Sequence, residues 1–166
     1  KKKFNVEKEI LVSLWGIETN FGKHAGKMDI LSSLATLSFD KRRSKFFSSQ
    51  LLTLLFLIDS KLIEPDTLYG SWAGAYGNFQ FMPSTIKNYA IDFDGNNKIE
   101  LKTSLKDSLA SAANYINKIG WKYNEPCFYK VELEREISKK YINTSARNIK
   151  NRIVIDKWKK KGLKNL

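Results

Sequence analysis

The sequence predicts a mainly α-helical fold on three observations. Apolar residues recur at helical spacing through most of the first two thirds of the chain, and two of these segments stop at a glycine. Strand-like alternation is confined to one short stretch near the C-terminus. The chain has 166 residues, of which 42% are hydrophobic, and this suits one domain, or one domain with a short appendage.

Three helices are expected in the first part of the chain. The first covers residues 6–21, where apolar side chains recur every three or four positions, and it stops at Gly22. The second and third cover residues 30–39 and 46–58. The apolar run at 51–58 is far shorter than the ~20 residues that cross a bilayer, so we expect a buried helix and no transmembrane segment.

Residues 70–81 have a different character, because three glycines are interleaved with four aromatic residues. This pattern predicts an irregular loop. Aromatic faces stack on sugar rings, and the amides of Asn78 and Gln80 can bind hydroxyl and N-acetyl groups. The loop is therefore either part of a sugar site or a core-packing segment with its aromatic side chains inside.

Two more helices and one strand are expected after this loop. A short helix starts at Pro83, and a longer one runs over residues 104–119 with Ser104 as its N-cap. Alternation over residues 129–133 predicts a single strand. We expect a catalytic core at residues 4–125 and a C-terminal extension of undetermined structure at 126–166.

The charge and the rare residue types narrow the function. A net charge of +12 favours a polyanionic partner, but no nucleic-acid recognition motif is present, so nucleic acid is not an expected partner. Cys127 and His24 are single residues of their types, which excludes an intrachain disulfide and a structural zinc site. A Ser-His-Asp triad would need His24, which has no supporting motif near it.

Glu18 is the unusual residue of the first predicted helix. On a helical wheel Leu11 and Trp15 lie within about 60° of it, so Glu18 projects from the apolar face. Desolvation there favours the protonated carboxyl, which is the form that a general acid needs. Gly16 and Gly22 leave room for a ligand nearby. The alternative is a glutamate that pairs with a basic residue and only orients the helix.

A series of short motifs covers roughly residues 6–130. They are WGIETNFG at 15–22, LATL at 34–37, RRSKFF at 42–47, GSWAGAYG at 70–77, QFMPS at 80–84, DFDG at 92–95 and LASAANY at 109–115. In residues and in order they resemble the membrane-bound lytic murein transglycosylase B family, which is lysozyme-like and related to the glycoside hydrolases. One such motif would be a weak signal, whereas this many in one order is specific.

The resemblance implies a lysozyme-like helical domain that cleaves the MurNAc-β-1,4-GlcNAc bond of peptidoglycan without water and leaves 1,6-anhydroMurNAc ends. Glu18 matches the catalytic glutamate of that family, and Ser71 matches the serine that orients it by a hydrogen bond. Expected substrate-binding residues are Gln80 and Tyr115, which match groove residues, and the loop aromatics Tyr76 and Phe81.

A single carboxylate suits this chemistry. Ordinary glycosidases use two carboxyl groups, whereas a transglycosylase uses the 6-hydroxyl of the sugar itself as the nucleophile. Glu18 would first protonate the leaving oxygen and then, as a carboxylate, take the proton of the 6-hydroxyl. The alternatives are a hydrolytic muramidase, which needs a second carboxylate about 5–9.5 Å away or a held water, and a non-catalytic peptidoglycan-binding module.

Residues 92–98 resemble the EF-hand-like calcium loop of the same family. The expected ligands are oxygen atoms of Asp92, Asp94, Asn96 and Lys98, the last through its backbone carbonyl. Asn97 stands where such a loop has glycine, and position twelve is Thr103 in place of a carboxylate. The prediction is therefore weak calcium binding or a metal-free turn, with no cofactor required.

The resemblance also gives a location and partners. It implies a protein of the periplasm or bacterial cell envelope that acts on peptidoglycan glycan strands. The sequence does not determine the oligomeric state, and a monomer is expected. No signal peptide is visible in this chain. Members of the family have further N-terminal and C-terminal segments, so we expect either a fragment or a protein with a more open groove.

Overall fold

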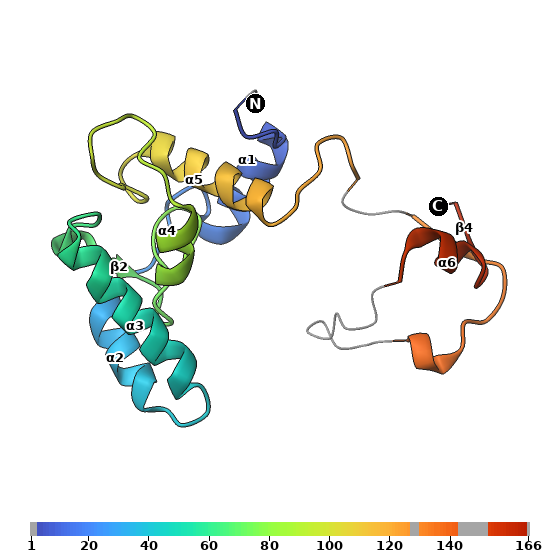
Figure 1. Ribbon diagram of the computed structural model, residues 1–166, viewed down its shortest axis with the longest axis horizontal. Coiled ribbons are helices and arrows are strands. Elements are labelled where there is room, and N and C mark those ends of the chain that lie inside the picture. Colours follow the sequence, from blue (N-terminus) through green and yellow to red (C-terminus); the bar gives the residue numbers. More distant parts are fainter. Residues whose placement is uncertain (1–2, 127–129, 143–152, 166) are drawn as a thin grey trace. The chain divides into compact units, whose positions relative to one another are not determined.

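The computed structural model describes residues 3–126, 130–142 and 153–165. The chain divides into two compact units, Lys1–Tyr123 and Asn124–Leu166, and each is described by itself (Figure 1). Cys127 and the first residue of the predicted strand, Tyr129, lie outside the described residues.

The first unit is helical, which confirms the predicted mainly α class. Its helices are α1 (Lys8–Thr19), α2 (Ile30–Phe39), α3 (Ser44–Asp59), α4 (Pro83–Tyr89) and α5 (Leu105–Lys118), with a short 3-10 turn at Pro65–Thr67. All five correspond to predicted helices, and α2 has the predicted bounds. The 3-10 turn was not predicted.

Local hydrogen bonds define where two of these helices begin. The Asp29 carboxylate accepts from Ser32 N at 2.6 Å and caps α2. The Ser104 hydroxyl accepts from Asp107 N at 3.2 Å and caps α5, as predicted. These caps satisfy backbone N–H groups that have no partner inside their own helix.

The core of the first unit joins the helices to the glycine-aromatic loop. Helix α2 packs against α3, α3 against α4, and α4 against α5. The side chains at the centre are almost fully buried and include Ile30, Leu34, Leu54, Leu57 and Ile86. Tyr76, Phe79 and Phe81 of the loop belong to the same buried cluster. The core-packing interpretation of the loop therefore holds for these three aromatic residues.

A small antiparallel ladder links the segment before α2 to the start of this loop. Strand β1 (Met28–Asp29) pairs with β2 (Tyr69–Gly70), and Met28 lies opposite Gly70. The sequence did not predict this ladder, because two-residue strands are too short to show a period of two. The ladder holds the α1–α2 connection beside the Ser71 segment.

The second unit contains the β element predicted near the C-terminus. Strand β3 (Glu132–Leu133) pairs antiparallel with β4 (Leu163–Lys164), and helix α6 (Ile155–Lys159) precedes β4. A 3-10 turn covers Lys139–Tyr141. Neither β4 nor α6 was predicted, because this part of the sequence has no clear periodicity.

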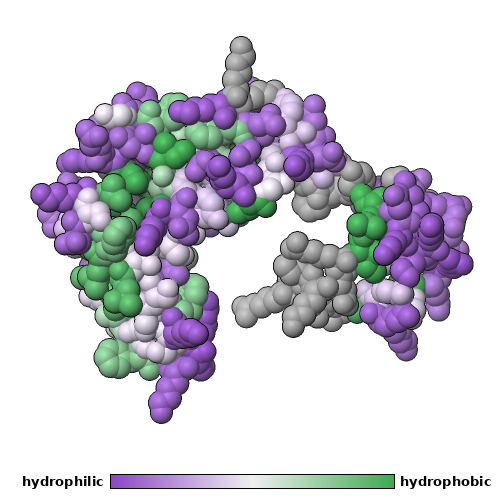
Figure 2. Space-filling view, in the orientation of Figure 1, coloured by the Kyte–Doolittle hydropathy of each residue, from purple (hydrophilic) through white to green (hydrophobic). Residues whose placement is uncertain are grey.

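Hydrophobic side chains reach the surface over the α2–α3 hairpin (Figure 2). The most exposed are Phe39 on α2 and Leu52 and Phe56 on α3. Among the described residues, no helix combines the length and apolar character that crossing a membrane requires.

Candidate functional site

Glu18 lies in the last turn of α1, and its side chain is exposed. The prediction that it is desolvated by the helix packing was therefore wrong. Leu11, Leu14 and Trp15 do pack against the core, as their positions on the wheel predicted. A helical wheel gives the direction of a side chain but not its position along the axis, and Glu18 is one residue from the end of the helix.

The buried residue at this end of the helix is Thr19, which is 1% exposed. Its hydroxyl donates to the backbone carbonyl of Asn78 at 2.9 Å. Asn78 itself is 6% exposed, and its side chain bonds to Trp15 and Ser108 inside the protein. Asn78 is therefore a structural residue of the loop, and the prediction that its amide could bind sugar was wrong.

Ser71 forms a tight turn within the loop. Its hydroxyl oxygen accepts from Ala75 N at 3.0 Å, and its backbone N donates to Ala75 O at 2.9 Å. Within the described residues no hydrogen bond joins Ser71 to Glu18, so the predicted contact is not formed in this structure. The Ser71 hydroxyl acts here as an acceptor, and its own hydrogen can still be donated.

Two contacts bring the α1–α2 connection against the Ser71 loop. Gly26 has φ +90°, and a Cβ at this position would lie 2.1 Å from the carbonyl carbon of Gly70 and 2.6 Å from Ser71 N. The Gln80 amide nitrogen donates to Ala25 O at 3.1 Å and to Gly77 O at 3.0 Å. The segment after Glu18 and the loop that carries Ser71 are therefore in direct backbone contact.

The four predicted substrate-binding residues divide into two pairs. Gln80 and Tyr115 are half-buried, and the Tyr115 ring packs edge-on against Phe81 with centroids 5.7 Å apart. In the described part of the chain no hydrogen bond involves Gln80 Oε1. Tyr76 and Phe81 are 3% and 7% exposed, so they support the loop from inside and do not offer a surface to a sugar.

The Tyr76 hydroxyl is also inside the protein. It lies 3.1 Å from the hydroxyl of Thr67, and burial raises the pKa of Tyr76 above its ordinary value. A neutral, hydrogen-bonded phenol in the core is a packing group.

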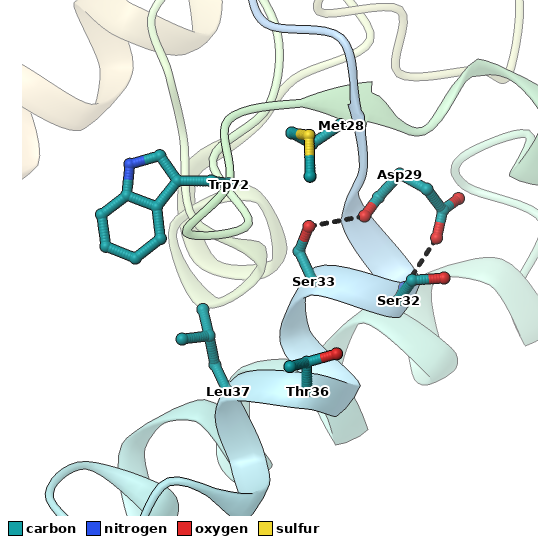
Figure 3. A pocket seen from close by; sticks show the side chains of 7 residues that line it. All are labelled: Met28, Asp29, Ser32, Ser33, Thr36, Leu37 and Trp72. Carbon is teal, nitrogen blue, oxygen red and sulfur yellow. Dashed lines mark hydrogen bonds between the residues drawn. The ribbon is translucent and has the colours of Figure 1, made fainter.

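An open pocket of about 300 Å³ adjoins the Ser71 segment (Figure 3). It is lined by Met28, Asp29, Ser32, Ser33, Thr36, Leu37 and Trp72. Trp72 follows Ser71 directly and is 68% exposed, and it lies across the pocket from the first turns of α2 (Figure 3). An exposed indole beside a pocket that also contains serine and threonine hydroxyls is a suitable surface for a sugar ring.

A second pocket of about 240 Å³ continues this surface, since it shares Leu37 and Trp72 with the first. Its other lining residues are Asp40, Arg42, Arg43 and Phe47. We call the two pockets together the Trp72 groove. From the sequence Trp72 was recognisable only as one of the loop aromatics, and it is not among the predicted site residues.

The two arginines of the Trp72 groove differ in their partners. Hydrogen bonds from Arg42 hold the pKa of the Asp40 carboxyl at about 2, so this pair is largely neutralised. The Arg43 guanidinium lies over the rings of Phe46 and Phe47, at 4.5 and 5.0 Å from their centroids. Among the described residues Arg43 has no carboxylate partner, so it is the cation of this groove that can meet an anionic group.

The loop at 92–98 is closed by its own hydrogen bonds. The Asp92 carboxylate accepts from the backbone N–H groups of Gly95, Asn96 and Asn97 at 2.7–3.2 Å. The Asn96 Oδ1 accepts from Lys98 N at 2.8 Å, and its Nδ2 donates to Glu100 Oε2 at 2.7 Å. The Asp92 carboxylate thus forms an Asx turn with the residues that follow it.

The structure adds Asp107 to the acidic residues of this loop, and Asp107 is not among the ligands that the sequence predicted. Its carboxylate is completely buried and accepts from Phe93 N at 2.9 Å and Glu100 N at 3.1 Å. Oxygen atoms of Asp92, Asp94 and Asp107 all lie within 4.8 Å of one another. The twelfth position of the loop, counted from Asp92, is Thr103, which has no carboxylate. Asp107 lies further along the chain, in the first turn of α5, and the fold brings its carboxylate to the loop.

Comparison with known proteins gives consistent results. Residues 1–166 match the family model described as "Transglycosylase SLT domain". Over 119 residues, or 71% of this chain and 33% of the relative, the chain is 44% identical to the membrane-bound lytic murein transglycosylase B of Escherichia coli K12.

Solved structures agree with this match. The soluble lytic transglycosylase SltB1 of Pseudomonas aeruginosa has a TM-score of 0.88 and 34% identity, over 98% of this chain and 54% of that one. SltB3 of the same organism, in complex with NAG-anhNAM-pentapeptide, has a TM-score of 0.83 and 34% identity, over 99% of this chain and 43% of that one. The Escherichia coli lytic transglycosylase Slt35 in complex with calcium has a TM-score of 0.74 and 40% identity, over 80% and 43% of the two chains.

These similarities confirm the predicted lysozyme-like helical fold class. The chain spans about a third of the curated relative and about half of SltB1.

Proposed function

Because the chain belongs to the transglycosylase SLT domain family, we propose that it is a lytic transglycosylase that cleaves the MurNAc-β-1,4-GlcNAc bond of peptidoglycan and leaves 1,6-anhydroMurNAc ends. The match of the whole chain to the family carries this proposal. The complex of SltB3 with NAG-anhNAM-pentapeptide supports it, because that ligand contains an anhydro sugar. The site of action would be the bacterial cell envelope, where peptidoglycan is found.

Glu18 is the acid and base of the proposed reaction. Its carboxyl protonates the glycosidic oxygen as the bond breaks, and the resulting carboxylate then accepts the proton of the 6-hydroxyl as that oxygen attacks the anomeric carbon. The nucleophile belongs to the same sugar, so no second enzymic carboxylate is needed. Since Glu18 is exposed here, the bound glycan itself would exclude water from around it.

The Trp72 groove is where we place the glycan strand. Its indole face can stack on a pyranose ring, and the hydroxyls of Ser32 and Thr36 can bind sugar hydroxyls. Arg43 can meet a carboxylate of the lactyl or peptide substituents of MurNAc. Ser71 directly precedes Trp72 and keeps a hydroxyl hydrogen free to donate, so it is the proposed hydrogen-bond donor to Glu18 when the glycan is bound.

The products of digestion test the proposal. Purified peptidoglycan incubated with the chain is expected to yield muropeptides with 1,6-anhydro ends, which are lighter by one water than reducing-end products and are separated by mass spectrometry. Reducing-end products would show a hydrolytic muramidase on the same fold. Binding to peptidoglycan without any product would show a binding module, and either result would contradict the proposed reaction.

We also propose that calcium binds at Asp92, Asp94 and Asp107. Three carboxylates with oxygen atoms within 4.8 Å repel one another when ionised, and oxygen-rich clusters of this type suit calcium. The Slt35 structure in complex with calcium supports the assignment. The ion would stabilise the loop before α5 and would not take part in the chemistry at Glu18.

Calcium is expected to raise the thermal stability of this chain. At a calcium concentration about 100 times the dissociation constant, binding adds about 2.7 kcal/mol, which should raise Tm by about 5–10 °C relative to the protein in EDTA. Asp94→Asn should abolish the shift, because this exposed carboxylate is a proposed ligand. Asp59→Asn, an exposed carboxylate at the end of α3, is the control and should keep it. Equal Tm values with calcium and with EDTA would refute the site.

A further inference from the structure

The residue that follows Glu18 is anchored in the interior. Thr19 is the one buried residue of α1. Its hydroxyl donates to Asn78 O at 2.9 Å and accepts from Gly22 N at 3.0 Å. The last turn of α1 is therefore tied both to the glycine-aromatic loop and to the chain that leaves the helix.

Asn78 connects this end of α1 to α5. Its Oδ1 accepts from Trp15 Nε1 at 3.1 Å, and its Nδ2 lies 3.0 Å from Ser108 Oγ and 3.2 Å from Leu101 O. Its backbone N also donates to Leu101 O at 2.8 Å. With its carbonyl bonded to Thr19, this one residue uses every polar group it has inside the protein.

The two attachment points on α1 flank Glu18. Trp15 and Thr19 are four residues apart, so they lie on the same face of the helix, one turn above the other. A helix held at two such points by one residue cannot rotate about its axis or slide without breaking a buried hydrogen bond. We call Trp15, Thr19 and Asn78 the α1 clamp.

The backbone two and three residues after Glu18 has a left-handed conformation, and the same clamp holds it. Asn20 and Phe21 have φ values of +49° and +58°, and the left-handed region is rare for a bulky residue such as phenylalanine. The Phe21 ring packs edge-on against Trp15 with centroids 5.4 Å apart. A Cβ at Gly22 would lie 2.7 Å from Asn78 Oδ1. Strained backbone of this kind persists only where surrounding contacts over-determine it.

Glu18 has no restraint of its own. In the described part of the chain its carboxylate makes no hydrogen bond and no ion pair, so the protein sets the position of Glu18 only through the backbone of α1. We propose that Asn78 is a positioning residue of the proposed reaction, and that it acts on Glu18 through the α1 clamp. This inference rests on the proposed role of Glu18. It matters because a misplacement of about 1 Å can lower catalysis by up to 10²-fold.

The test separates turnover from binding. On soluble, uncrosslinked glycan strands, Thr19→Val should lower kcat at least about 10-fold, with KM within about twofold of wild type. Thr19→Ser keeps the hydroxyl and should restore kcat to within about twofold. Trp15→Phe and Asn78→Ala should lower kcat in the same way. If Asn78→Ala does not fold, the two substitutions on α1 still decide the question.

Ser111→Ala is the control for a purely structural loss. Ser111 is fully buried on α5, and its hydroxyl accepts from Ile91 N at 2.9 Å, away from α1. This variant should lose stability but keep kcat. Positioning is refuted if Thr19→Val, compared at equal folded fraction, lowers kcat no more than Ser111→Ala does. Full activity of Glu18→Gln would instead refute the proposed role of Glu18, and wild-type digests without 1,6-anhydro ends would refute the proposed function, so these failures can be told apart.

Discussion

Glu18→Gln is expected to lower the turnover of peptidoglycan at least about 100-fold, because an amide can neither give a proton to the leaving oxygen nor take one from the 6-hydroxyl. The substitution keeps the size of the side chain. Since Glu18 is exposed and without a hydrogen bond in the described part of the chain, the fold should not change. Release of anhydro-ended muropeptides, measured over time by mass spectrometry, gives the rate.

Glu9→Gln is the matched control for this experiment. Glu9 is an exposed glutamate in the first turn of the same helix, at the end away from Glu18. Its replacement removes the same charge from α1 and should leave turnover within about twofold of wild type. If Glu18→Gln retained a third or more of the activity, another group would have to be the acid.

Gly26→Ala is expected to cost about 3 kcal/mol or more of unfolding free energy, which lowers Tm by about 10 °C in a chain of this size. Two effects add at this position. The φ of +90° is unfavourable for alanine, and the new Cβ would lie 2.1 Å from the backbone of Gly70, which cannot move as a side chain can. Thermal unfolding followed by circular dichroism measures the change.

Gly95→Ala separates the two effects. Gly95 also has a positive φ, +79°, but no atom lies within 4 Å of a Cβ built there. This variant should lose only about 1–2 kcal/mol, and the comparison is made in EDTA so that calcium plays no part. Similar losses for both glycines would mean that the contact between Gly26 and Gly70 is not tightly packed.

The helices were predictable because their signals are local. The spacing of apolar residues, and the residues that start or stop a helix, can be recognised within one segment. They predicted all five helices of the first unit, and the predicted bounds of α2 are the observed ones. The N-cap at Ser104 was found in the same way. The β1–β2 ladder was not predictable, because two residues on each side carry no pattern and the pairing joins segments far apart in the chain.

The candidate site was predictable only in part, because contacts between residues far apart in the sequence decide which of its side chains are buried. Motifs identified Glu18 and Ser71 as candidate residues. The exposure of Glu18, however, depends on its position one residue before the end of α1, which a motif does not give. Asn78 and Gln80 are both loop amides, yet Asn78 is buried because Trp15, Thr19 and Ser108 converge on it. Asp107 joined the acidic cluster through the fold, where counting along a loop could not find it.

The contacts of the α1 clamp also have a consequence for folding. They join residues 59 and 63 positions apart, whereas the α2–α3 hairpin is formed by neighbouring segments. Local contacts close small loops and form early, while distant ones must wait for the chain to come together. The hairpin is therefore expected to be in place before the end of α1 is held. During synthesis, this protein would form its helical hairpin first and the geometry of its proposed catalytic residue last.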